Sequence, residues 1–147
     1  MDDLKKLTLE IEELKKTYKE KAKAALLNDV FPGFFKSHPE IKAVYWCQYT
    51  PYFNDGDPCV FNVGEVCLSN IEDFESNDNF DGYYESYIDG KYTWELDDKK
   101  LETDFSVVAA FISSNKNLML DLYGDHSTIV IHNSDPIEAS VSEYDHD

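Results

Sequence analysis

The sequence contains no arginine: all 13 basic residues are lysines, set against 30 acidic residues, and the formal net charge is −17. The arginine side chain is the one best suited to grip phosphates and the edges of bases. Binding to nucleic acid also needs a basic surface, which this composition does not provide. We therefore expect no direct nucleic-acid partner, although the missing arginine also fits coding by an AT-rich genome.

Cysteine is scarce, and long apolar runs are absent. Cys47, Cys59 and Cys67 make an odd number without a CxxC pair, which is typical of reduced thiols in a cytosolic protein. No run of about 18 apolar residues occurs that could span a membrane. The first residues are acidic where a secretory leader would be basic, so we expect no leader. These features predict a cytoplasmic protein without a membrane partner.

The common catalytic motifs GxSxG, HExxH, GxxxxGK[ST] and GxGxxG are also missing. Cys47 or Cys59 could act with His38 as a nucleophile and base, but no feature of the sequence brings them together. Four carboxylates fall in or beside a connector expected over residues 97–103, where solvation explains them: Asp97, Asp98, Glu102 and Asp104. We expect neither a cofactor nor enzymatic activity.

What the sequence does contain is enough apolar and aromatic material for a core: 42% of its 147 residues are hydrophobic and 14% are aromatic. A disordered acidic chain would be poor in aromatic residues. We predict a single α+β domain over residues 1–147. A long N-terminal helix packs on an antiparallel sheet of four to six strands, and a helical pair precedes the last hairpin.

The N-terminal helix is predicted over residues 2–29. Its apolar residues follow a 3-4-3-4 spacing, which is typical of an amphipathic helix: Leu4, Leu7, Ile11, Leu14 and Tyr18. The sequence Phe31-Pro32-Gly33 is expected to end it. The apolar face either packs on the protein's own sheet or pairs with a second copy as a short coiled coil.

The hairpin-rich sheet is predicted over residues 41–96. A strand at 41–49 and a second at 59–68, bulged at Gly64, flank the long loop 50–58. The sequence Asp89-Gly90 lies between two alternating aromatic runs and is a strong signal for a two-residue hairpin turn. A helical region at 104–123, closed by Gly124, and a closing hairpin at 127–144 complete the fold.

The acidic residues form the first candidate site. The loop 50–58 is rigid and acid-tipped, and the stretch 72–104 is rich in carboxylates, so both are expected to contact a basic protein. The predicted partner-binding residues are Tyr52, Phe53, Asp55, Asp57, Glu72, Asp73, Glu75, Asp78, Asp81, Asp97 and Asp98. The alternative is that the loop residues only shape the backbone and the charges only solvate the surface.

A second candidate site combines aspartate and histidine residues from three segments. Carboxylates and imidazoles are ligands for hard and borderline divalent ions. The candidate ligands are Asp55, Asp57, Asp125, His126, Asp145 and His146. The alternative is that Asp125 and His126 form a turn and that the last residues are a frayed acidic terminus.

The string QYTPYFNDGDPC at residues 48–59, together with GDH at 124–126 and EYDHD at 143–147, resembles small acidic proteins of phage and bacterial genomes that have no assigned activity. The resemblance implies a phage setting and carries over no catalytic or ligand residue. Together with the charge, it leads us to expect a non-enzymatic binding protein in the host cytoplasm. It would engage a basic host protein, such as a nucleic-acid-binding protein, as an inhibitor or DNA mimic.

Three other functions remain open. The first is a metal-dependent hydrolase or metal-binding protein that uses the aspartate and histidine segments. The second is an immunity- or antitoxin-like protein, which would need the same negative charge to neutralise a basic toxin. The third is an oligomeric structural protein that assembles through the N-terminal helix.

Overall fold

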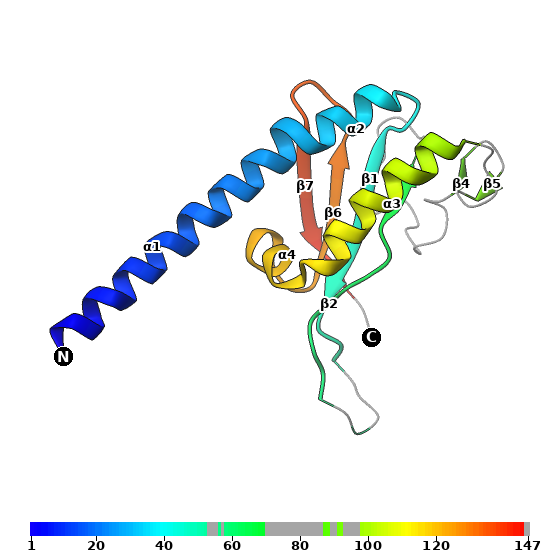
Figure 1. The fold of residues 1–147 in the computed structure, drawn as a ribbon. Helices are drawn as coiled ribbons and strands as arrows, with labels where there is room; N and C mark the ends of the chain where they lie inside the picture. The colour runs from blue at the N-terminus through cyan, green and yellow to red at the C-terminus, as the bar shows by residue number, and fades with distance from the viewer. Residues whose placement is uncertain (53–55, 57, 70–86, 89–90, 93–97, 146–147) are drawn as a thin grey trace.

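The structure is a computed structural model that describes residues 1–147 except 53–55, 57, 70–86, 89–90, 93–97 and 146–147. It confirms the predicted α+β class (Figure 1). A long N-terminal helix leads into a five-stranded antiparallel sheet, and two helices precede the last hairpin. None of the helices in the described part of the chain combines the length and apolar character needed to cross a membrane.

The N-terminal helix is longer than predicted, because Pro32 does not end it. Helix α1 (Asp2–Ala25) continues through one π-helical segment, η1 (Leu26–Val30), into α2 (Phe31–Ser37). Within η1 the N–H of Phe31 donates to the carbonyl of Leu26, five residues back. A proline ring normally clashes with the carbonyl four residues before it. The wider π turn gives that ring room, so the predicted end at residue 29 is wrong.

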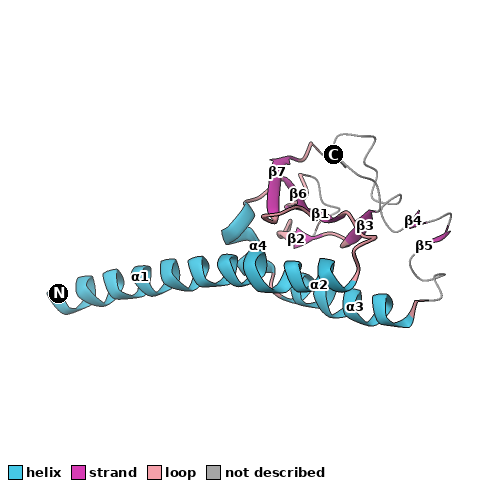
Figure 2. Ribbon diagram, turned by 90° about the horizontal axis from the view of Figure 1, so that it is seen from above, coloured by secondary structure: helices cyan, strands magenta, loops and turns pink. Residues whose placement is uncertain are grey.

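Only the C-terminal part of this helix packs on the sheet. All 24 residues of α1 are described and none of them is buried. Ala22 is half-buried against the core, Leu26 is buried, and α2 then buries three aromatic rings: Phe31, Phe34 and Phe35. The N-terminal part of α1 extends away from the body of the protein (Figures 1 and 2).

The sheet is built around β1, which pairs with β2 and β3 along one side and with β6 along the other, while β7 forms an edge. Its strands are β1 (Ala43–Tyr49), β2 (Asn62–Val63), β3 (Cys67–Ser69), β6 (Ser127–His132) and β7 (Glu138–Glu143). Both predicted hairpins of this sheet are confirmed.

The predicted irregularity at Gly64 is also present, and it divides the second strand into β2 and β3. The Gly64 N–H donates to the carbonyl of Cys47 over 2.7 Å. A β-carbon at position 64 would lie 2.9 Å from that same oxygen, so the close approach requires glycine.

A small second sheet consists of β4 (Tyr87–Ile88) and β5 (Lys91–Tyr92). Tyr87 pairs with Tyr92 and Ile88 with Lys91, which is the antiparallel pairing predicted around Asp89-Gly90. The turn itself, and the remainder of the two predicted strands, lie outside the described residues.

Two helices follow, α3 (Lys99–Ser114) and α4 (Lys116–Tyr123). The prediction of a connector up to residue 103 is wrong, because Asp98 caps α3: its side chain accepts a hydrogen bond of 3.0 Å from the Leu101 N–H. This early start buries Leu101 in the core. The predicted end is confirmed, since Gly124 closes α4 with a φ of 86°.

The helices lie together on one face of the sheet (Figure 2). The main core fills the space between these two layers and is centred on buried side chains such as Trp46, Met119 and Ile129. The Trp46 indole donates to the side-chain oxygen of Gln48, whose amide donates to the carbonyls of Met119 and Gly124. These buried hydrogen bonds attach β1 to the end of α4 and leave the Gln48 amide satisfied.

Candidate functional site

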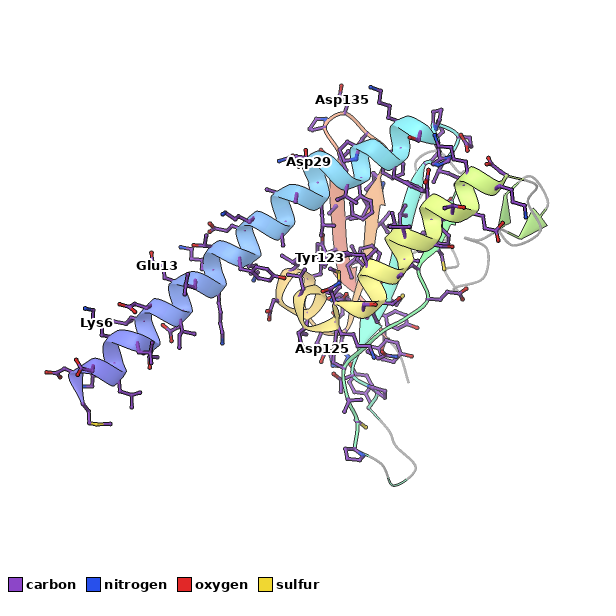
Figure 3. All side chains as sticks on the ribbon, in the orientation of Figure 1. Lys6, Glu13, Asp29, Tyr123, Asp125 and Asp135 are labelled. Carbon is purple, nitrogen blue, oxygen red and sulfur yellow. The ribbon has the colours of Figure 1, made fainter. Side chains whose placement is uncertain are left out.

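The loop after β1 is attached to the turn between α4 and β6 through Asp125. Its carboxylate accepts hydrogen bonds from the Thr50 N–H (2.8 Å), the Thr50 hydroxyl (2.7 Å) and the His126 N–H (2.8 Å). Desolvation acts to raise the pKa of Asp125, but these bonds and the adjacent imidazole outweigh it and lower the pKa below 3.8. The first role of this carboxylate is therefore to hold the loop. Its place at the end of α4 is labelled in Figure 3.

The C-terminal segment reaches the same end of the sheet. The ring of Tyr52 stacks on the imidazole of His126 with a centroid distance of 4.7 Å, and the His126 carbonyl accepts from the Tyr144 N–H over 2.7 Å. The rings of Tyr49 and Tyr144 lie 5.2 Å apart. The loop after β1, the turn at residues 124–126 and the C-terminal segment therefore meet at this end of the sheet. His126, in that turn, has a positive φ of 50°.

Among the described residues, the structure brings only two of the six predicted metal ligands together. Asp125 and His126 lie side by side, with 3.8 Å between the Asp125 Oδ2 and the His126 Nε2. Asp145 is exposed, and Asp55, Asp57 and His146 lie outside the described residues. Within the described part of the chain, the groups that lie close enough to share one ion are on other residues: His38, Glu40 and Asp98.

Most of the predicted partner-binding residues lie outside the described part of the chain. Of the two that are described, Tyr52 is 62% exposed and covers His126, while Asp98 is the cap of α3. The predicted partner-binding residues that lie outside the described part are Phe53, Asp55, Asp57, Glu72, Asp73, Glu75, Asp78, Asp81 and Asp97.

Cys47 does not form an activated nucleophile with His38. The three cysteines are thiols that form no disulfide with one another, and Cys47 and Cys67 are buried. Burial raises the pKa of Cys47 to about 11, against a smaller lowering effect of the Thr128 hydroxyl. The imidazole of His38 instead contacts Asp104, with 2.7 Å between Nε2 and Oδ2. Cys47 is thus a core residue.

A row of exposed apolar side chains follows helix α1. We call it the α1 stripe: Leu4, Leu7, Ile11, Leu14 and Tyr18. Each of these side chains is 42–68% exposed, on a helix that leaves the body of the protein. The 3-4-3-4 spacing identified these residues but could not tell self-packing from pairing with another chain. The structure shows that the stripe is not covered by the described part of this chain.

No protein-family model, no curated protein and no solved structure matches this chain. The resemblance to small acidic phage and bacterial proteins therefore stays a prediction. Proposals about function depend on the surfaces and side chains of the chain itself.

Proposed function

We propose that this protein is a non-enzymatic binding protein that pairs with a second copy through the α1 stripe and presents acidic bodies to a basic protein. The observation that carries the proposal is the exposure of the α1 stripe along a helix with no buried residue. The strong negative charge supports the second half of the proposal.

An uncovered helix of this kind is expected to have a partner. Helices in water gain most of their stability from packing an apolar face rather than from intrinsic propensity. Helix α1 has 24 residues, and its half-exposed leucines form one continuous row. Monomeric proteins rarely expose contiguous apolar patches that have no function.

A second copy is the occupant that the register of α1 favours. Leu4, Ile11 and Tyr18 occupy one core position of a heptad, and Leu7 and Leu14 occupy the other. In a parallel pair, Glu10 of one copy would then face Lys15 of the other, and symmetry makes two such attractive pairs.

The α1 stripe ends just before the helix begins to pack on the chain's own core. Lys21 occupies the next core position and would interrupt an apolar seam. One residue later, Ala22 packs against the hydrophobic core of the chain's own body. The apolar face thus serves two partners in turn: another chain up to residue 18, and this chain's sheet from residue 22 onward.

The charge distribution is compatible with this arrangement. Residues 1–36 contain 8 lysines and 7 acidic residues, whereas residues 37–147 contain 5 lysines and 23 acidic residues. The helical arm is therefore nearly neutral and can approach a second arm without strong repulsion. The body carries the negative field that would attract a basic protein and raise its association rate.

Sedimentation equilibrium of the full chain at about 1–100 µM tests the pairing. We expect a reversible change from the 17.0 kDa chain mass to twice that mass. A mass of 17.0 kDa throughout this range would contradict pairing with a second copy and would direct attention to a different chain as the occupant. A stable larger assembly would contradict the two-stranded arrangement.

A further inference from the structure

We infer that His38, Glu40 and Asp98 form a binding site for one borderline divalent metal ion, such as Mn²⁺, Fe²⁺ or Zn²⁺. One ligand atom from each residue lies within 4.8 Å of the other two. His38 and Glu40 follow the end of α2, and Asp98 precedes α3, so the site joins two elements that are far apart in the sequence but adjacent in space (Figure 1). It shares no residue with the aspartate and histidine segments proposed from the sequence.

His38 is prepared to act as a ligand through Nδ1. Its side chain is 3% exposed, and Nε2 lies 2.7 Å from Oδ2 of Asp104. An ionised carboxylate only accepts hydrogen bonds, so we assign the proton of the neutral imidazole to Nε2. Nδ1 then carries a lone pair and lies 3.8 Å from Oε1 of Glu40. Among the described residues, no hydrogen bond is made to this nitrogen.

This arrangement is the one that metal-bound histidines usually show. The nitrogen that does not bind the metal donates to a carboxylate, which fixes the ring and makes the other nitrogen more basic. Here Asp104 is that carboxylate and acts as a positioning residue. The ring is held further by Phe34, whose centroid lies 5.1 Å away, and by the backbone bond from the His38 N–H to the Phe34 carbonyl.

The two carboxylate ligands leave the site open to solvent. The Glu40 side chain is 49% exposed, and Asp98 is exposed as well. Oδ1 of Asp98 caps α3 by accepting from Leu101, which leaves Oδ2 for an ion. A cation would also offset the two negative charges that Glu40 and Asp98 bring close together.

The donor set indicates which ions would bind. One imidazole nitrogen with two carboxylate oxygens suits Mn²⁺, Fe²⁺ and Zn²⁺, whereas Mg²⁺ and Ca²⁺ prefer oxygen alone. Water would complete the coordination on the exposed side. Bound there, the ion would link the end of the N-terminal helix to the start of α3.

Titration of the chelator-treated full chain with Mn²⁺, followed by the electron paramagnetic resonance of the free ion, tests this site. Mn²⁺ is chosen because thiolates bind it weakly, so the cysteines do not compete. Excess Mg²⁺ and about 0.15 M salt suppress binding to the general negative charge. We expect one Mn²⁺ per chain.

The variants locate the ion. Glu40→Gln, Asp98→Asn and His38→Ala should each weaken Mn²⁺ binding by at least about tenfold, and Asp104→Asn by about tenfold through loss of orientation. Asn can still cap a helix, so Asp98→Asn keeps the start of α3. Glu102→Gln is the matched control, because it removes the same charge from the first turn of the same helix and should leave binding unchanged.

Two results would overturn the inference. One is the absence of stoichiometric Mn²⁺ binding to the wild-type chain. The other is an equal loss of affinity in Glu40→Gln and Glu102→Gln, which would show that net charge alone holds the ion. Glu40→Gln decides the matter even where His38→Ala fails to fold, because half of the Glu40 side chain faces solvent.

Discussion

Replacing Leu7 by alanine gives the sharpest test of pairing through the α1 stripe. Leu7 is 50% exposed in the single chain, so about half of its apolar surface remains to be buried by a second copy. Full burial of a leucine side chain contributes about 1.5–3 kcal/mol, and half of it about 0.8–1.5 kcal/mol. The substitution occurs in both copies, so the loss doubles to about 1.5–3 kcal/mol. At about 1.4 kcal/mol per factor of ten, the dissociation constant should rise about ten- to hundredfold.

Leu9→Ala is the matched control for this variant. Leu9 is two residues away on the same helix and is 66% exposed, but it lies outside the α1 stripe. Sedimentation equilibrium of the wild-type chain and both variants should show a weakened dimer only for Leu7→Ala. Circular dichroism should show the same fold for all three. An equal effect of the two substitutions, or none from Leu7→Ala, would refute the assignment of the stripe as the paired surface.

Four further predictions concern the body of the protein. Gly64→Ala should lower the free energy of urea unfolding by about 1–3 kcal/mol, because its methyl group would meet the carbonyl of β1. Gly33→Ala, which has open space within a helix, should raise it by about 0.5–1 kcal/mol. The lowered pKa of Asp125 stabilises the fold above pH 3.8, and this contribution is lost as the pH falls through the folded-state value. Asp125→Asn should therefore flatten the acid side of the thermal stability profile. Iodoacetamide should modify Cys59 first, because the other two thiols are buried.

The elements that the sequence predicted well are those with local signals. The pairing of the two strands that flank Asp89-Gly90, the glycine after α4 and the alternating strands each depend on backbone preferences within a few residues. The predicted helix end before Pro32 was wrong, because the π turn that accommodates this proline has no comparable local sequence signal. The start of α3 at Asp98 was missed for another reason: the same polar residue types occur at helix caps and in solvated connectors.

The candidate sites also differ in whether a local sequence signal predicts them. The spacing of apolar residues predicted the α1 stripe, but its exposure depends on where the helix begins to pack on the sheet. The cluster around His38 had no such signal, since Asp98 and Asp104 come 60 or more residues later and reach the imidazole only through packing of α3 beside α2. Tertiary contacts decide both cases.

Added salt distinguishes self-association from binding to a basic protein, because it should weaken only the second. Two paired chains bring together two bodies that each carry most of a net charge of −17, while their arms are nearly neutral. Raising the salt above about 0.15 M shortens the Debye length below about 8 Å and screens this repulsion, so self-association through the apolar stripe should hold or strengthen. The same screening should weaken attachment to a basic partner recovered by cross-linking from cells. If the dimer dissociated with added salt, charge rather than the α1 stripe would hold it together. If binding to the basic partner were insensitive to salt, the acidic body would not be the recognition surface.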